Sequence, residues 1–270
     1  MNPKTIDPQR AEAGAESVSA VLLVGGMGTR LQSVLPTTPK PLAPLGEISF
    51  LELLILQLRS QGIRRLVMCT GHRAEQIDKE CGDGQKWEMA IEYSRESQPL
   101  GTGGALKFAE PLLRQSDEFL VMNGDSFLEF DFQQFLEFHR QHYGQASLAV
   151  RNVPDASRYG AVQLASDKRV TGFCEKNNSG APGVVNGGVY LFNRAVLQHF
   201  PDGPSSLERD IFPLLLNQGV YAMEQIGMFI DIGTPDDYAR AQMMAQSLRQ
   251  AANADMPPEA QVRSLNYLVR

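Results

Sequence analysis

A glycine-rich segment followed by an arginine is the first part of the chain whose residue types suggest chemistry. Gly25, Gly26 and Gly28 come directly after a short apolar run, and Thr29 and Arg30 follow them. Glycines at the end of a strand let the backbone approach a ligand closely and turn its N–H groups toward phosphate oxygens. The planar guanidinium of an arginine can hold two phosphate oxygens at once. The segment is therefore typical of a phosphate site.

A second cation, Lys40, stands between two prolines in the nearby run T-P-K-P-L. The prolines restrict the backbone on both sides of this compact point charge. Arg30 and Lys40 together suit a triphosphate, although these residues alone also fit a structural turn with two solvated surface charges. Two common nucleotide fingerprints are absent, because G-x-G-x-x-G would need a glycine where Leu31 stands and G-x-x-x-x-G-K-[ST] occurs nowhere.

Two aspartates are candidates for metal chemistry. Asp125 follows an apolar run and the dipeptide Asn123-Gly124, so it is expected at the carboxyl end of a buried strand, where open α/β sheets bind ligands. Asp231 lies between an apolar segment and the last long helix, and by itself it fits an ordinary turn or helix cap. Carboxylate oxygens are the ligands that Mg²⁺ prefers. Asp125 is therefore the stronger candidate from the residues alone.

A second glycine segment, Q-P-L-G-T-G-G, contains Gln98, Gly101 and Thr102 and opens a predicted helix. Taken alone, it fits a tight turn between a strand and a helix.

Strands and helices alternate in the first half of the chain, which predicts a doubly wound parallel sheet. The second half is richer in strands, and helices return near its end. The expected strands are 20–24, 66–70, 90–93, 119–122, 147–151, 161–164, 170–175, 184–192 and one near residue 230. The expected helices are 50–60, 74–80, one after residue 104, 132–139, 207–216 and 235–248.

Composition excludes several classes of protein. Of 270 residues, 43% are hydrophobic and 21% are charged, so the chain can bury a core and is not disordered. A net charge of −6 repels polyanions, so no nucleic-acid partner is expected. No apolar run approaches the length of a membrane span, so no membrane partner is expected either. Three cysteines, far apart and odd in number, favour the cytoplasm. We expect a flexible N-terminal arm (1–17), one domain (18–250) and a C-terminal tail (251–270).

The motifs together resemble a known family, the sugar-1-phosphate nucleotidyltransferases or nucleotide-sugar pyrophosphorylases. Its signature, G-G-x-G-T-R-L after a strand and then P-K-P-L, stands here at 24–31 and 39–42, and the likeness covers about 19–246. The resemblance implies an α/β fold, a Rossmann-like three-layer α/β/α arrangement with a mixed, mostly parallel central sheet. It also implies that Gly25, Gly26, Gly28 and Thr29 bind the triphosphate. Arg30, Lys40 and Asp125 would then be the catalytic residues.

The resemblance extends to the metal and the base. Where relatives carry W-x-D-x-G-T, this chain has F-I-D-I-G-T, which implies that Asp231 is a second metal ligand beside Asp125 and that Mg²⁺ is the cofactor. Relatives with P-L-G-T-x-G use that segment against the nucleobase and the ribose. Gln98, Gly101 and Thr102 are therefore expected to bind the nucleotide.

The sugar-phosphate side is implied by three further matches. The segment F-C-E-K is similar to the family's F-x-E-K, with Asn177 in place of the following proline, and V-N-G-G-V-Y is similar to N-x-G-x-Y. A dipeptide Tyr-Gly is a weaker match to a sugar contact. The residues expected to bind the sugar phosphate are Tyr159, Gly160, Glu175, Lys176 and Asn186.

A finer resemblance concerns the substrates. The run T-R-L-Q-S-V is similar to the guanylyltransferase branch that acts on D-glycero-α-D-manno-heptose 1-phosphate. The expected partners are therefore a nucleoside triphosphate, preferably GTP, and a sugar 1-phosphate, preferably that heptose phosphate, while a homo-oligomer is left open. The alternatives are mannose 1-phosphate with GTP, or another hexose 1-phosphate with UTP, CTP or dTTP. A catalytically silent nucleotide-sugar sensor is the alternative from another class.

Overall fold

The apolar run after the N-terminal segment forms the central strand of the main sheet. The computed structural model describes residues 14–157, 159–174 and 180–252. Strand β1 (Ser19–Leu23) pairs in parallel with β4 (Arg65–Thr70) on one side and with β6 (Glu118–Asn123) on the other. Its first four residues are buried, as expected for a strand that is covered on both faces.

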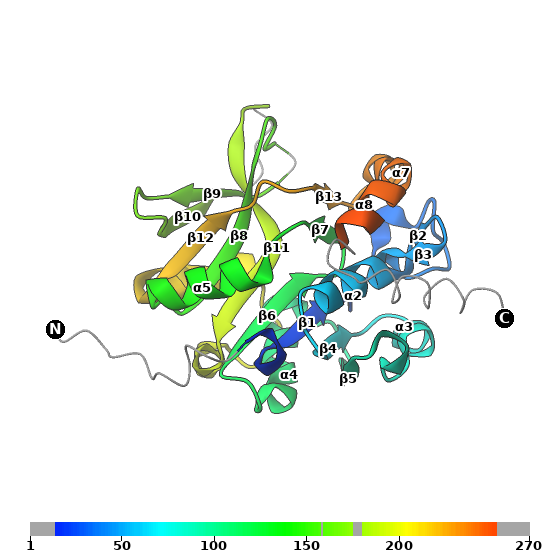
Figure 1. Ribbon diagram of the computed structural model, residues 1–270, viewed down its shortest axis with the longest axis horizontal. Coiled ribbons are helices and arrows are strands. Elements are labelled where there is room, and N and C mark those ends of the chain that lie inside the picture. The colour runs from blue at the N-terminus through cyan, green and yellow to red at the C-terminus, as the bar shows by residue number, and fades with distance from the viewer. Residues whose placement is uncertain (1–13, 158, 175–179, 253–270) are drawn as a thin grey trace.

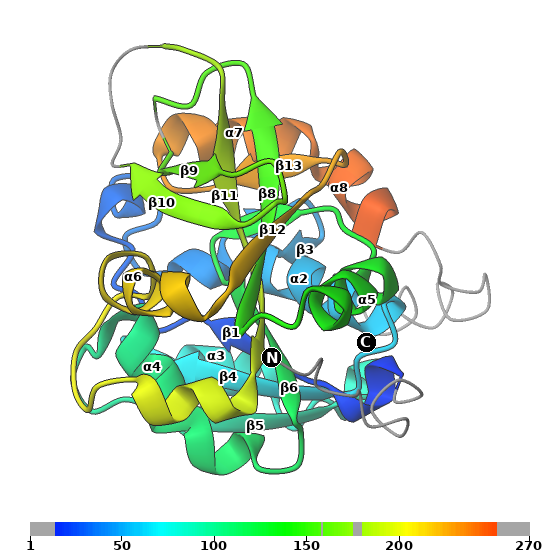
Figure 2. The ribbon, with the colours of Figure 1, turned by 90° about the vertical axis from the view of Figure 1, so that its left-hand side faces the viewer.

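The main sheet has nine strands and mixes parallel with antiparallel pairing. Its order is β10-β9-β11-β6-β1-β4-β5, and β8 joins β11 to β12. Pairing is parallel around β1 and between β8 and β12, and it is antiparallel along β11. The remaining strands of this sheet are β5 (Ala90–Arg95), β8 (Ala146–Val153), β9 (Ala161–Leu164), β10 (Val170–Cys174), β11 (Gly183–Asn193) and β12 (Val220–Glu224). Figure 2 shows β8, β11 and β12 in the upper part of the molecule and β4 and β5 in the lower part.

Helices cover both faces of the sheet. Ala20 and Leu22 of β1 face one apolar core, which includes side chains of α2, α3, α5, α7 and α8. Val21 faces the other core, which includes α4 and α6. In Figure 1, α2 and α4 lie on opposite sides of β1. The helices are α2 (Phe50–Ser60), α3 (Ala74–Cys81), α4 (Gly101–Ala109), α5 (Phe132–His142), α6 (Phe212–Leu215), α7 (Pro235–Met243) and α8 (Ala245–Ala252). The predicted α/β/α arrangement is confirmed.

Two helices that the sequence predicts as continuous are interrupted. The expected helix 207–216 is a π-helical turn (Leu207–Ile211), the short α6 and a 3-10 turn (Leu216–Gln218). The expected helix 235–248 divides at Met244 into α7 and α8. The helix expected after residue 104 begins earlier, at Gly101.

Some strands were not predicted. Strand β12 adds to β8, and the short β7 (Ser126–Leu128) pairs with β13 (Phe229–Asp231) outside the main sheet. A small hairpin of β2 (Pro44–Leu45) and β3 (Ile48–Ser49) precedes α2. The β7–β13 ribbon matters most, because it joins the neighbourhoods of the two candidate aspartates.

The first described residues contact the domain, and the last ones belong to its final helix. Residues Ala15–Ser17, within the expected arm, form a 3-10 turn, and the carbonyl oxygen of Ser17 accepts hydrogen bonds from Ser116 Oγ at 3.0 Å and Arg65 Nη2 at 3.1 Å. Helix α8 reaches Ala252, two residues into the expected tail. The division into arm, domain and tail stays a prediction. Among the described residues, no helix is both long and apolar enough to cross a membrane.

Candidate active site

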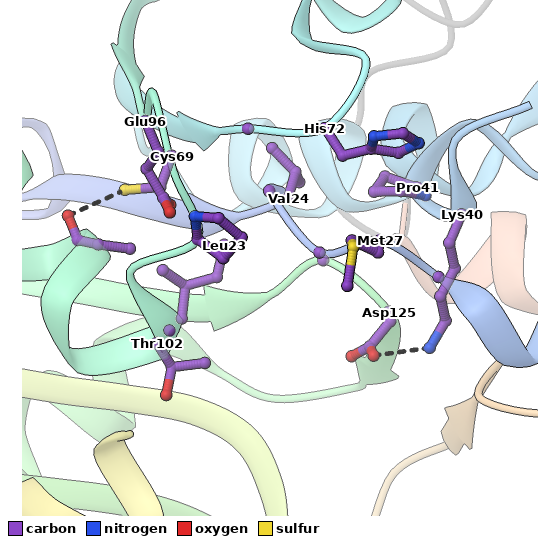
Figure 3. A pocket seen from close by; sticks show the side chains of 18 of the residues that line it. Leu23, Val24, Met27, Lys40, Pro41, Cys69, His72, Glu96, Thr102 and Asp125 are labelled. Atoms are coloured by element: carbon purple, nitrogen blue, oxygen red, sulfur yellow. Dashed lines mark hydrogen bonds and ion pairs between the residues drawn. The ribbon is translucent and has the colours of Figure 1, made fainter. Parts of the chain in front are cut away.

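A cavity of about 620 Å³ opens at the carboxyl ends of β1, β4 and β6. Leu23, Cys69 and Asn123, from the ends of these three strands, all line it. Among the residues expected to act on the nucleotide, it is lined by Gly25, Gly26, Gly28, Thr29, Arg30, Lys40, Gln98, Gly101, Thr102 and Asp125. Figure 3 shows the cavity from close by. The structure therefore brings the whole expected nucleotide set to one place.

The first glycine segment touches the lysine segment directly. Gly28 has a φ of +59°, a left-handed conformation that favours glycine, and a Cβ atom built on it would lie 2.9 Å from Lys40 Cβ. Gly26 differs, because a Cβ atom there meets no atom within 4 Å apart from its chain neighbours. The fold thus requires glycine at Gly28 but leaves open space in front of Gly26.

Lys40 forms an ion pair with Asp125. The distance between Lys40 Nζ and Asp125 Oδ2 is 2.7 Å, and the lysine side chain is only 10% exposed while the aspartate is 39% exposed. Figure 3 shows this contact at one end of the cavity. Arg30 is exposed, and its Nη2 lies 3.7 Å from the position of a Cβ atom built on Gly233. Both expected cations therefore lie beside the aspartates.

The β7–β13 ribbon brings the two aspartates together. Asp231 pairs with Ser126, the residue after Asp125, and Ile232 N donates to the carbonyl oxygen of Asp125 at 2.9 Å. Burial raises the pKa of Asp231, and the negative charge of Asp125 raises it further, whereas Lys40 lowers it. The two carboxylates therefore lie within electrostatic reach of each other, although Asp231 is not part of the cavity lining.

The donor set fits a divalent cation that arrives with phosphate. Two carboxylates that repel each other, one of them largely desolvated, gain from a shared cation. Mg²⁺ is usually held by one or two carboxylates, with substrate phosphates and waters as the other ligands. In the described part of the chain, no group of three or more His, Cys, Asp or Glu side chains could hold a metal. Two carboxylates are thus the described side chains that could contact a cation here, the number that Mg²⁺ uses when phosphates are its other ligands.

The second glycine segment has a packing role that the sequence interpretation did not include. Gly103 N donates to the carbonyl oxygen of Ser205 at 2.8 Å, and a Cβ atom on Gly101 would lie 2.5 Å from that oxygen. Thr102 Oγ1 accepts a hydrogen bond from Leu207 N at 2.8 Å and donates to Glu208 Oε2 at 3.4 Å. These contacts fix the cavity wall against the segment 203–208.

The described sugar-side candidates, Tyr159, Gly160 and Asn186, lie outside the cavity lining. Asn186 Nδ2 donates to Tyr190 Oη at 2.8 Å, and Asn186 N donates to the carbonyl oxygen of Gly160 at 3.4 Å. The ring of Tyr159 packs on Phe229, with centroids 5.4 Å apart. Asn186, Tyr159 and Gly160 thus gather near β11 and β13. Glu175 and Lys176 lie outside the described residues.

Two carboxylates near the cavity were missed. Glu96 lines the cavity, and burial raises its pKa, while a hydrogen bond from Leu100 N acts in the opposite direction. Its position directly after a strand of the parallel sheet is a signal that the sequence offered. Glu208 accepts hydrogen bonds from Thr102, Ser206 and Tyr190, and no sequence signal marks it because its partners come from three separate segments.

Comparison with known proteins places the chain among nucleotidyl transferases. Residues 19–247 match the family model described as nucleotidyl transferase. The chain is 36% identical over 233 residues to D-glycero-alpha-D-manno-heptose 1-phosphate guanylyltransferase of Aneurinibacillus thermoaerophilus, which covers 85% of this chain and 99% of that protein. It is also 36% identical over 227 residues to mannose-1-phosphate guanylyltransferase of Mycobacterium tuberculosis, covering 83% of this chain. In that comparison the chain spans only 63% of the relative's length.

A solved structure agrees with the sequence comparison. The crystal structure of HddC from Yersinia pseudotuberculosis complexed with GMP-PN is 31% identical and has a TM-score of 0.76, covering 84% of this chain and 98% of that one. The family expected from the motifs is confirmed, and so is its Rossmann-like fold. The chain belongs to the nucleotidyl transferase family.

Proposed function

We propose that the protein transfers a nucleotidyl group from a nucleoside triphosphate to a sugar 1-phosphate, releasing pyrophosphate. GTP is the proposed donor and D-glycero-α-D-manno-heptose 1-phosphate is the proposed acceptor. The observation that carries this proposal is the meeting of Asp125 and Asp231 beside Lys40 and the glycine segment, at the carboxyl ends of the strands.

The reaction forms one P–O bond and breaks another. An oxygen of the acceptor phosphate attacks the α-phosphorus in line, the bond between the α-phosphorus and the bridging oxygen breaks, and pyrophosphate leaves with the electron pair. The acceptor phosphate is already an anion near neutral pH, so no strong general base is needed. Catalysis then depends on alignment and on stabilising the charge that develops on the phosphates.

Different residues of the chain have different roles in this reaction. Backbone N–H groups of the segment 25–29 hold the phosphate oxygens, and Arg30 and Lys40 stabilise their negative charge. Lys40 exchanges its ion pair with Asp125 for a phosphate oxygen when the nucleotide binds. Asp125 and Asp231 would hold Mg²⁺, which when bound neutralises phosphate charge. Asn186, Tyr159 and Gly160 orient the acceptor sugar.

The relatives support guanine, and a short motif supports the heptose. Both guanylyltransferases named above share 36% identity with this chain, so overall similarity favours neither acceptor. The run T-R-L-Q-S-V favours the heptose phosphate. Mannose 1-phosphate is the second candidate, because the mannose-1-phosphate enzyme is equally similar.

A substrate matrix tests the proposal. The protein is incubated with Mg²⁺, with each of GTP, ATP, UTP, CTP and dTTP, and with the 1-phosphates of the heptose, mannose and glucose, and pyrophosphate release is measured. We expect the highest kcat/KM for GTP with the heptose phosphate and no release by Asp125→Asn. Absence of pyrophosphate from every pair, with nucleotide binding intact, would favour the silent sensor and contradict the proposed activity.

A further inference from the structure

His72 lines the cavity from a part of the chain that none of the motifs above includes. It lies two residues after β4, and its backbone N donates to the carbonyl oxygen of Gly25 at 3.4 Å, next to the glycine segment. Its side chain is exposed, and within residues 14–157, 159–174 and 180–252 its ring forms no hydrogen bond or ion pair. An imidazole always carries at least one N–H group, so His72 can donate a hydrogen bond to a ligand in the cavity.

The chain holds His72 on the same face of the sheet as Lys40. Arg73, the next residue, has a φ of +58°, a left-handed conformation that turns the chain from β4 into α3. Its Nη2 donates to the carbonyl oxygen of Pro36 at 3.0 Å, in the segment that leads to Lys40. Helices α2 and α3 pack in the apolar core on this face, whereas α4, which begins at Gly101, packs in the opposite core. His72 thus lies away from the second glycine segment, which is expected to bind the base and the ribose.

The order of the strands separates His72 from the acceptor side of the site. The strands run β11-β6-β1-β4, so the glycine segment after β1 lies between β11, which carries Asn186, and the end of β4, which leads to His72. Asp125, two residues after β6, lies on the β11 side of that segment. In Figure 3, His72 and Asp125 lie on opposite sides of the turn that carries Met27. A ligand that extends from the acceptor side across the glycine segment therefore reaches His72.

In-line transfer gives this separation a chemical meaning. The attacking oxygen, the α-phosphorus and the leaving oxygen lie roughly on one line, so pyrophosphate leaves on the side opposite the acceptor. With the acceptor near β11 and the α-phosphate near Asp125 and Lys40, the β- and γ-phosphates extend toward the end of β4. Pyrophosphate takes the electron pair of the broken bond, and hydrogen-bond donors to its oxygens stabilise the charge that develops there.

We propose that His72 binds the β- and γ-phosphates of the nucleoside triphosphate and the pyrophosphate that they become. Its imidazole N–H donates a hydrogen bond to a phosphate oxygen, while Arg30 and Lys40 supply positive charge. This inference rests on the proposed function for the direction of the triphosphate, and it assigns the leaving group to a side chain outside the motifs described above.

Ligands with different numbers of phosphates test the contact. Loss of one hydrogen bond to a charged group should weaken binding about 10- to 100-fold, so His72→Ala should bind GTP, GDP and inorganic pyrophosphate that much less tightly in calorimetry. Its affinity for GMP should be unchanged, because GMP has neither the β- nor the γ-phosphate. His72→Gln keeps an N–H donor and should retain most of the affinity for pyrophosphate. His199→Ala is the control, since His199 is also exposed but does not line the cavity.

The same measurements separate this inference from the proposed reaction. Thermal unfolding checks that each variant is folded. Equal losses of affinity for GMP and GDP in folded His72→Ala, or an unchanged affinity for pyrophosphate, would overturn the role of His72 and leave the reaction standing. Wild-type protein whose pyrophosphate binding depends on His72, but which releases no pyrophosphate from any substrate pair, would contradict the reaction alone.

Chemical modification of the wild-type protein gives a test that does not depend on the variants. Bound pyrophosphate should slow the reaction of His72 with diethyl pyrocarbonate, followed by mass spectrometry of peptides, and leave the reaction of His199 unchanged. If neither His72 variant folds, an unchanged rate at His72 in the presence of saturating pyrophosphate overturns the proposal.

Discussion

Replacing Gly26 with alanine distinguishes the effect of this glycine on stability from its proposed effect on nucleotide binding. The space in front of Gly26 is open, and its φ lies outside the left-handed region that alanine avoids. Alanine narrows the range of unfolded conformations, so Gly26→Ala is expected to raise the free energy of unfolding by about 0.4–1 kcal/mol or leave it unchanged. Stability alone therefore gives no reason for a glycine at this position.

The added methyl group enters the cavity where the phosphates are proposed to bind. It keeps phosphate oxygens from approaching the backbone N–H groups of the segment. Loss of one hydrogen bond to a charged group costs about 1.5–3 kcal/mol, which corresponds to about a 10- to 100-fold lower kcat/KM for GTP. The same loss is expected in the affinity for GDP.

Gly28→Ala is the matched control, because this glycine is required by the fold itself. Its φ of +59° costs an alanine about 1–2 kcal/mol. The close approach to Lys40 Cβ adds to that cost, so the free energy of unfolding should fall by at least about 1 kcal/mol. Urea unfolding of both variants and pyrophosphate release by both give the comparison. Gly26→Ala with wild-type kcat/KM for GTP would refute the assignment of the segment to the triphosphate.

Three further changes probe the carboxylates and the thiols. Burial and Asp125 raise the pKa of Asp231 in the folded protein, so wild-type stability falls as pH rises through that pKa. Without divalent cation, Asp231→Asn should therefore have a higher melting temperature than the wild type near pH 7. In thermal unfolding scans, this difference in melting temperature should disappear as the pH is lowered toward about 4. Burial raises the pKa of Cys81 to about 12 and raises that of Cys69 as well, so in a Cys174→Ser background neither thiol should react with a disulfide reagent near pH 8 until urea is added. Glu208→Gln loses one acceptor of its network, so KM for both substrates should rise about tenfold and the free energy of unfolding should fall by about 1–3 kcal/mol, measured by kinetics and urea unfolding.

Opposite results would be equally informative. If metal-free Asp231→Asn melts at a lower temperature than the wild type, the fold stabilises the ionised form of Asp231 in the wild-type protein. Rapid labelling of the native thiols would contradict the buried positions of Cys69 and Cys81. A Glu208→Gln variant that only loses stability, with both KM values unchanged, would limit Glu208 to a structural role.

Sequence patterns correctly predicted the elements whose boundaries are set by residues close by in the chain. Helix α2 begins and ends where the leucine spacing predicts, and Ser49 Oγ accepts a hydrogen bond from Glu52 N at 3.1 Å as its N-terminal cap. The segment 207–218 did not follow its helical pattern for a tertiary reason. Leu207 N donates to Thr102 Oγ1 of a distant helix, and Pro213 has no N–H to continue a regular ladder. Contacts of this kind cannot be inferred from apolar spacing.

The candidate site also has parts that short motifs could predict and parts that depend on contacts between distant segments. Segments 25–30 and 39–42 are close in sequence, and their motif was sufficient to place Lys40 beside the glycines. Glu208 could not be identified from the sequence, because its hydrogen bonds form only when three separate segments come together. Strand β12 was missed because its short alternating pattern gives a weak signal until it pairs with β8.

The meeting of the two aspartates depends on two glycines, Gly124 directly before Asp125 and Gly233 two residues after Asp231. Gly124 N donates to the carbonyl oxygen of Leu23 at 3.0 Å, and a Cβ atom on Gly124 would lie 2.7 Å from that oxygen, so only glycine lets the chain pass this close to the end of β1. A Cβ atom on Gly233 would collide with the carboxylate of Asp231, to which Gly233 N donates its hydrogen bond. The first glycine sets Asp125 beside the segment 25–29, and the second holds the carboxylate of Asp231 in the turn that follows β13. The N-G-D and D-I-G runs therefore contain the glycines that place the aspartates as well as the proposed metal ligands. Short motifs could for this reason point to a site built from distant parts of the chain.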